Sequence, residues 1–185
     1  MVKEHADILA PFITEIVNLS VKHGEVSDNL KLATITPILK KLILDCEVLA
    51  NYRPISNLPF IAKVVEKVIA TQVIEHVEAN NLQDKWQSAY KEGHGTETAL
   101  ICVLDYILTS LGNGNICVLI MLDLSAAFDT VDHKCLINRL EIKYGITGIA
   151  LQWLRSYLHD RKSTVCVNGE SSEVRVMSTA VHLVY

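Results

Sequence analysis

The sequence predicts a mixed α+β fold on three observations. Apolar residues recur at helical spacing in several stretches, one continuous apolar run has the length of a buried strand, and an Asn168-Gly169 pair marks a β-hairpin. The 185 residues are 50% hydrophobic and 21% charged, which excludes disordered and low-complexity proteins. We therefore expect one domain of ordinary size, or slightly more.

Five helices and three extended regions are expected. Helical spacing of apolar residues predicts helices over about 8–19, 61–77, 96–111, 132–145 and 147–159, the fourth with Asp132 as its N-cap. Residues 32–39, with Pro37 among them, favour an edge strand. The continuous run 116–122 is typical of a strand buried on both faces, and 164–167 with 174–176 form the predicted hairpin.

Charge and cysteine usage limit the class of protein. A net charge of −4 and a pI near 6.0 argue mildly against a self-sufficient nucleic-acid-binding domain, which is usually strongly basic. The five cysteines are far apart, which disfavours a disulfide framework and a structural zinc site. No signal peptide or membrane-spanning run is evident, so we expect an intracellular protein of the cytoplasm or nucleus.

Asp123 is the main candidate for chemistry. It follows the apolar run 116–122 directly and lies on the same strand face as Cys117, so it closes an apolar row with a charge. The strand simply ending in a solvated carboxylate is one reading, and a ligand for a hard cation such as Mg²⁺ is the other. Ser125, two positions on, weakens a D-x-D phosphatase motif, Asp132 is better explained as a helix cap, and Asp129 stays open.

Four ordered segments resemble the reverse transcriptases of non-LTR (LINE-type) retrotransposons. The run LDLSAAFDTVDH at 122–133 resembles the first metal-binding motif of their palm. Three segments come before this run, in the same order as in the family. They are ITPILKK at 35–41, NYRPISNLP at 51–59, and QSAY at 87–90 through TETAL at 96–100. The resemblance extends from near residue 8 to about residue 177 and implies a partial right-hand polymerase fold, with fingers and the first part of the palm.

The resemblance implies a role for each matched residue. Asp123, with the Leu124 carbonyl, would ligate the catalytic Mg²⁺ pair, and the other implied nucleotide contacts are Lys40, Lys41, Arg53, Ala126, Ala127 and Phe128. Gln87, Tyr90 and Lys91 would lie along the template. Implied substrates are an RNA template, a DNA primer and a dNTP. Without the family, Lys40-Lys41 is a solvated pair, Phe128 a core aromatic, and 87–91 a loop with a packed tyrosine.

Departures from the family pattern shape the expected activity. The family usually has arginine and serine at the positions of Lys91 and Gly95, and lysine cannot reproduce a bidentate fork. The tail 178–185 resembles neither the glycine-containing block nor the Asp-Asp hairpin that come next in the family. We therefore expect a truncated domain whose two-metal site is incomplete and which is inactive alone.

The expected organisation is a fingers-like segment at 1–94 and a palm segment at 95–130, followed by helices and a hairpin at 131–177 and the tail at 178–185. The missing palm strands would leave the run 116–122 exposed and the chain prone to aggregate. Two alternatives stay open. One is a non-catalytic module that holds nucleic acid through Lys40, Lys41, Arg53 and Lys91, and the other is a retroelement relic without function.

Overall fold

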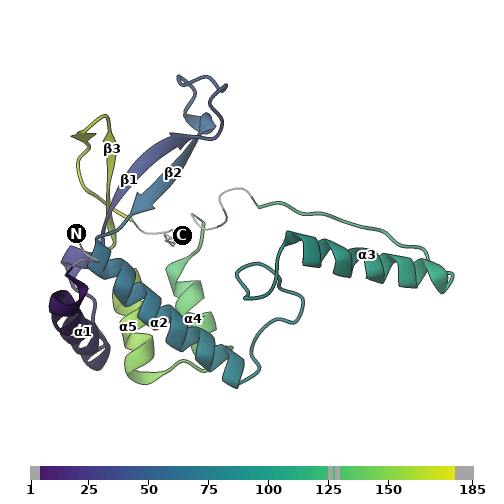
Figure 1. Cartoon of the computed structure of the whole chain (residues 1–185), viewed down its shortest axis with the longest axis horizontal. Helices are drawn as coiled ribbons and strands as arrows, with labels where there is room; N and C mark the ends of the chain where they lie inside the picture. The colour runs from purple at the N-terminus through teal and green to yellow at the C-terminus, as the bar shows by residue number, and fades with distance from the viewer. Residues whose placement is uncertain (1–4, 125–126, 128–129, 178–185) are drawn as a thin grey trace. The chain divides into compact units, whose positions relative to one another are not determined.

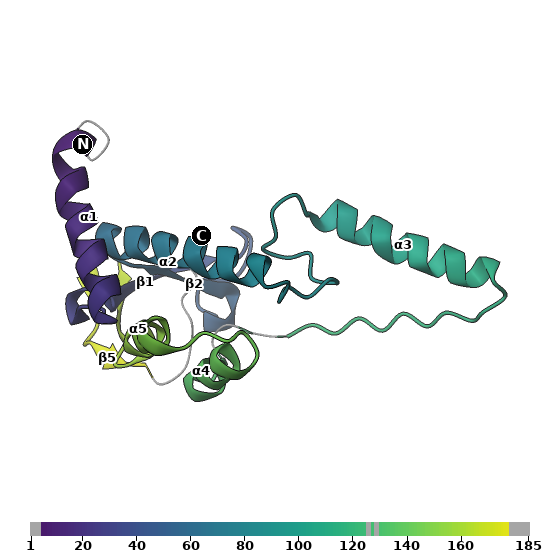
Figure 2. The same cartoon turned by 90° about the horizontal axis from the view of Figure 1, so that it is seen from below.

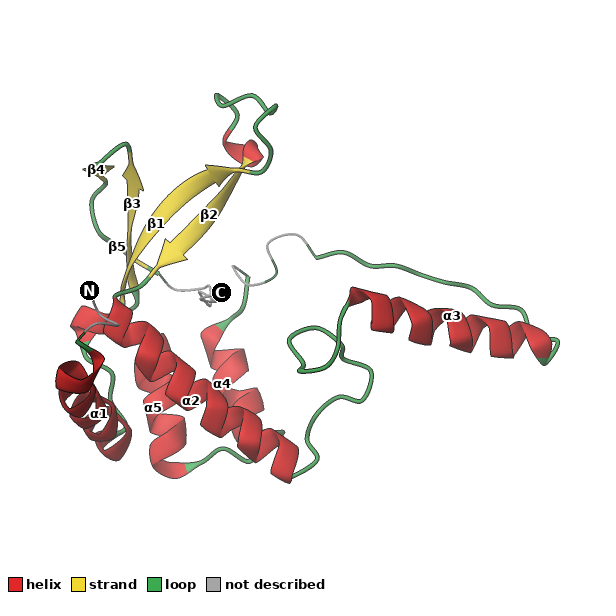
Figure 3. Ribbon diagram, viewed as in Figure 1, coloured by secondary structure: helices red, strands yellow, loops and turns green. Residues whose placement is uncertain are grey.

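The computed structural model describes residues 5–124, 127 and 130–177. In this part of the chain, five α-helices and one sheet confirm a mixed α and β architecture (Figures 1 and 3). The chain divides into two compact units, one of Met1–Ile74 with Ala126–Tyr185 and one of Glu75–Ser125. The fingers and palm boundaries expected above stay a prediction.

The helices follow the predicted periodicities closely. Their bounds are α1 Ala6–His23, α2 Phe60–Ala79, α3 Thr96–Gly112, α4 His133–Ile142 and α5 Gly148–Leu158. Asp132 caps α4 as predicted, because its Oδ1 accepts a hydrogen bond of 2.8 Å from the Cys135 amide. Short 3₁₀ turns precede β1 and β2, at Asp28–Leu30 and Leu49–Asn51.

The sheet belongs to the first unit and has the order β2-β1-β3-β4, with β5 also pairing with β3. Its strands are β1 Leu32–Leu39, β2 Tyr52–Asn57, β3 Lys162–Val167, β4 Glu170–Ser171 and β5 Arg175–Val176. β1 pairs with β2 antiparallel and with β3 parallel, so the expected edge position is wrong for Leu32–Ile35, whereas Pro37 lies beyond the pairing with β3. Asn168 and Gly169 both have positive φ, 52° and 87°, between paired Val167 and Glu170, which confirms the predicted turn. The strand paired across it is β4, not the predicted 174–176, whose Arg175 and Val176 form β5 and pair with Ser163 and Lys162.

The hydrophobic core of this unit lies among α1, α2 and α5 and at the start of β1. Val17, Val65 and Trp153 bring α1, α2 and α5 together, and Ala33 of β1 packs with Ala62 of α2. Helices α4 and α5 also lie against each other (Figure 2). Leu30 packs against both buried clusters, so the start of β1 is joined to the helices.

The strand predicted for residues 116–122 is wrong. The structure gives residues 115–124 no regular secondary structure, and Ile116, Ile120 and Leu122 are 94%, 75% and 89% exposed. A strand forms only when a neighbouring strand takes its backbone hydrogen bonds, and none of the described strands pairs with this segment. The apolar run is therefore exposed, as expected for a strand without neighbours.

In the described part of the chain, no helix combines the length and the apolar character that crossing a membrane requires.

Candidate functional site

Asp123 and Leu124 lie in the exposed segment that follows α3. Both side chains are exposed, Leu124 by 76%. Of the residues matched to nucleotide contacts, Ala126 and Phe128 lie outside the described residues, as does Asp129. Ala127 is half-buried, and its carbonyl accepts a 3.2 Å hydrogen bond from the Thr130 hydroxyl.

The described residues do not form a metal site. No three histidine, cysteine, aspartate or glutamate side chains gather anywhere in the described ranges. Mg²⁺ takes six oxygen ligands, and a catalytic pair needs several carboxylates to fix it. Asp123 and one carbonyl therefore do not suffice to hold the ion pair that the family resemblance implies.

The β1–β2 hairpin brings two of the predicted cations to one face. Arg53 lies opposite Ile38, and Lys40 is two residues further along the same chain, with its amide bonded to the Asn51 carbonyl at 2.8 Å. Because side chains alternate along a strand, Lys40 and Arg53 share a face. The Lys40 ammonium donates to the Ala50 carbonyl at 2.7 Å, whereas Arg53 is exposed on β2.

Lys41 begins the loop between β1 and β2 and is exposed. This loop also exposes large apolar side chains, with Leu42 96% and Ile43 90% exposed. The hairpin end therefore presents cations beside apolar groups, a surface that offers both charge and contact area.

The residues matched to the template lie in the loop between α2 and α3, in the Glu75–Ser125 unit. The Gln87 amide group donates to the Ala89 carbonyl at 3.1 Å. Tyr90 is 69% exposed and has a φ of 58°, and Lys91 is half-buried. The prediction of a packed tyrosine in a plain loop does not describe Tyr90, whose ring is mostly in solvent. The hairpin cations belong to the other unit.

Sequence reasoning missed a buried polar cluster between α2, α5 and β3. Arg161 is 1% exposed, and its guanidinium carbon lies 4.4 Å from the centre of the Tyr157 ring. The Tyr157 hydroxyl donates to the Glu66 carboxylate. Burial raises the pKa of the Glu66 carboxyl, and the Tyr157 hydrogen bond and the Arg161 charge only partly oppose that rise.

The guanidinium of Arg161 is poorly satisfied. Its Nη1 reaches the Tyr157 carbonyl at 3.5 Å, while its buried Nε and Nη2 have no hydrogen-bond partner among the described residues. These two nitrogens share the edge that grips a carboxylate with two parallel bonds. The sequence does not predict this burial, because Arg161 comes directly before Lys162, the first residue of β3, and the two look like a solvated basic pair.

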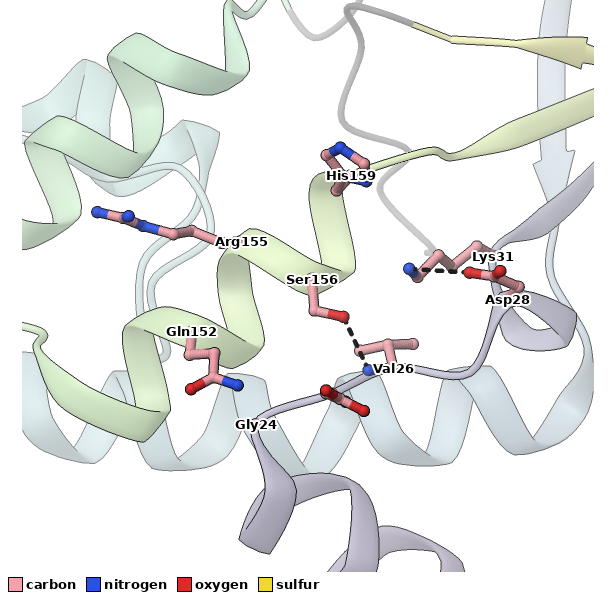
Figure 4. A pocket seen from close by; sticks show the side chains of 9 residues that line it. Gly24, Val26, Asp28, Lys31, Gln152, Arg155, Ser156 and His159 are labelled. Carbon is pink, nitrogen blue, oxygen red and sulfur yellow. Dashed lines mark hydrogen bonds and ion pairs between the residues drawn. The ribbon is translucent and has the colours of Figure 1, made fainter.

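A second feature that the sequence did not announce is an open pocket of about 540 Å³ between the loop after α1 and the polar side of α5 (Figure 4). Each of its basic side chains lies beside a carboxylate. Lys31 pairs with Asp28 at 3.1 Å, Arg155 pairs with Glu141 at 3.1 Å, and His159 lies 3.0 Å from Asp160. The Ser156 hydroxyl accepts from the Val26 amide. The polar side chains around this pocket are thus mainly paired with neighbouring groups of the protein.

Comparisons with known proteins agree with the resemblance. The sequence profile of the family "Reverse transcriptase (RNA-dependent DNA polymerase)" matches residues 38–182, so it reaches beyond residue 177, where the resemblance was expected to end. A "Probable RNA-directed DNA polymerase from transposon X-element" of Drosophila melanogaster is 37% identical over 63% of this chain and 13% of its own length.

Two further relatives cover more of the chain. An "RNA-directed DNA polymerase from mobile element jockey" of Drosophila funebris is 30% identical over 80% of this chain and 16% of its own length. A "Probable RNA-directed DNA polymerase from transposon BS" of Drosophila melanogaster is 29% identical over 71% of this chain and 14% of its own length. The chain thus spans only 13% to 16% of these curated relatives. It belongs to the reverse transcriptase (RNA-dependent DNA polymerase) family, as a reverse transcriptase domain of the LINE-type, non-LTR class.

Proposed function

We propose that this chain is the fingers and the first part of the palm of an RNA-directed DNA polymerase. The observation that carries the proposal is the family match over residues 38–182, which contains the end of β1, the loop after it, β2, the α2–α3 loop and Asp123. The substrates would be an RNA template, a DNA primer and a dNTP. Relatives whose names state this activity support the proposal, although each is several times longer than this chain.

The hairpin would contribute to binding the triphosphate of the dNTP. Lys40 and Arg53 share one face of the hairpin, Lys41 follows directly, and all three are exposed. Arginine and lysine near a polyanion stabilise it by charge and by charge-assisted hydrogen bonds. Lys40 would exchange its bond to the Ala50 carbonyl for a phosphate oxygen, so we expect Arg53 to contribute more of the affinity.

Asp123 would ligate Mg²⁺ only together with carboxylates from outside the described residues. We propose that this 185-residue chain does not polymerise by itself; in support, no three metal-ligating side chains gather among the described residues, which leave out Asp129. Binding of a nucleotide and of a template strand does not require the complete metal pair, so we expect the chain to bind both without polymerising.

Primer extension on an RNA template tests the proposal. We expect no extension by the chain with Mg²⁺ or Mn²⁺. Template-dependent synthesis that is abolished by Asp123→Ala, but kept by Asp105→Ala, would show that the chain is a complete catalyst. Asp105 is a matched control because it is an exposed carboxylate of α3 in the same unit.

A non-catalytic nucleic-acid-binding module is the second candidate function, and the exposed cations of the hairpin, Lys40, Lys41 and Arg53, favour it. It predicts binding of single-stranded RNA or of an RNA–DNA hybrid that weakens steeply with salt. Neutralising Arg53 with Arg53→Gln should reduce both affinity and salt dependence. Lys67→Gln, on the exposed side of α2, is the matched control and should change neither strongly.

A further inference from the structure

Trp86 is an exposed tryptophan in the loop between α2 and α3. The side chain is 73% exposed, whereas the chain's other tryptophan, Trp153, is 3% exposed in the core of the other unit. Tryptophan is the side chain with the largest flat apolar surface, and it is usually well buried. Its exposure here leaves the face of the ring accessible to a ligand.

Local contacts hold Trp86 in a defined position. The Trp86 amide donates to the Asp84 carboxylate at 2.9 Å, and the Gln87 amide donates to the Asp84 carbonyl at 3.2 Å. The Lys85 ammonium lies 4.7 Å from the centre of the Trp86 ring, in cation–π contact. The ring therefore combines a flat apolar surface with a positive charge at its side.

The same loop carries a second exposed aromatic in a strained backbone. Tyr90 is 69% exposed, and its φ of 58° is a left-handed conformation that a non-glycine residue adopts only at a cost of roughly 1 kcal/mol or more. Lys91 follows it directly. The loop thus presents two aromatic rings, each with a lysine as sequence neighbour, instead of burying them.

We propose that Trp86, with Lys85, is a stacking platform for an unpaired base of a single-stranded polynucleotide. Aromatic rings interleaved with lysines suit this ligand, because the ring stacks on a base while the ammonium meets a phosphate. The Asp84 carboxylate accepts the Trp86 amide and keeps its negative charge, which the ammonium of Lys85 next to it offsets. The inference rests on the proposed function and extends its template contacts at Gln87, Tyr90 and Lys91.

Tryptophan fluorescence of the whole chain tests the platform directly. Because Trp153 is buried, a stacked base should quench the emission of Trp86 alone. The probes are oligouridine and oligodeoxythymidine of about 12 nucleotides, within the site size of single-strand binders. Quenching by either strand supports the proposal, and comparison of the two shows whether the 2′-hydroxyl is recognised.

Binding of the same oligonucleotides, followed by anisotropy of a dye on the strand, isolates the contribution of stacking. Trp86→Leu should weaken binding by about 5- to 150-fold, and Trp86→Phe by less, without changing the salt dependence. Lys85→Ala should instead reduce the salt dependence by about one charge. The matched control is Tyr144→Leu, which removes the 5.4 Å cation–π contact with Lys143 in the other unit and should leave binding unchanged.

Three outcomes would contradict the inference in distinguishable ways. If the unaltered chain binds neither strand, the proposed function fails together with the platform. If it binds but Trp86→Leu binds equally well, only the platform is wrong. If the Trp86 emission shifts with protein concentration in the absence of oligonucleotide, the ring is buried against another copy of the chain, and the platform is also wrong.

Discussion

Replacing Arg161 with methionine should cost the fold little, although Arg161 is the most deeply buried charged residue of the described chain. The substitution loses the cation–π contact with Tyr157, worth roughly 2 kcal/mol in a desolvated site. It also removes two buried N–H donors without partners, Nε and Nη2, each of which costs about 1–3 kcal/mol. The relief of about 2–6 kcal/mol from the two donors matches or exceeds the lost contact, so Arg161→Met should be at most about 1 kcal/mol less stable than the unaltered chain.

Glu66 makes the result depend on pH in a defined direction. Burial raises the pKa of Glu66, so its carboxyl contributes stability that is present in acid and is lost as the pH rises through its folded value. Without Arg161 the ionised carboxylate loses a nearby cation. The free energy of unfolding of Arg161→Met, relative to the unaltered chain, should therefore be higher near pH 4 than at pH 7. Adding Glu66→Gln should remove this dependence on pH.

Chemical denaturation at both pH values, followed by circular dichroism, measures these differences. Arg155→Met is the matched control, since it removes an exposed arginine paired with Glu141, and surface pairs contribute roughly 0–1 kcal/mol. A loss of 3–5 kcal/mol for Arg161→Met would refute the reasoning, because that is the cost of breaking a satisfied buried ion pair. It would mean that Nε and Nη2 of Arg161 are paired with a carboxylate in the folded protein.

Two further predictions concern the helix cap and the exposed apolar run. Asp132→Ala should lower the melting temperature, and this loss should be smaller in acid. The Cys135 amide holds the pKa of Asp132 below its usual value, and the stabilisation disappears as the pH falls through that lowered pKa. A melting temperature equal to that of the unaltered chain at neutral pH would contradict the cap. Ile120→Lys should reduce aggregation, measured by light scattering, because it places a charge in an apolar segment that is 75% exposed at this position; Thr71→Lys, on the exposed side of α2, is the control and should leave aggregation unchanged.

The helices and the hairpin were predictable because their signals are local. The stripe from Ile61 to Val77 gives α2, Asp132 gives the start of α4, and Asn168-Gly169 gives the turn between β3 and β4. Each depends on residues a few positions apart, so neighbouring side chains decide the outcome. The run 116–122 is different, since a strand needs a partner that its own sequence does not supply.

The candidate site was predictable only in part, for the same reason. The hairpin pairing that puts Lys40 and Arg53 on one face follows from two adjacent extended segments. The burial of Arg161 does not follow from its neighbours, because the parallel pairing of β3 with β1 places it there, across about 130 residues of chain. Trp86 was overlooked because the loop that contains it has no periodic pattern, and exposure cannot be read from an isolated aromatic.

The distribution of apolar side chains explains why the two units differ. Every hydrophobic residue found buried in the described chain belongs to the unit of Met1–Ile74 with Ala126–Tyr185, and none to Glu75–Ser125. Helix α3 exposes apolar side chains around its surface, among them Leu100, Tyr106 and Leu108, and its only charged residues are Glu97 and Asp105. A helix that is apolar on all sides is stable when other protein surrounds it. The half-hydrophobic composition therefore supports one buried core in the described chain, whereas the apolar side chains of α3 in the other unit stay exposed and offer a surface on which further protein could pack.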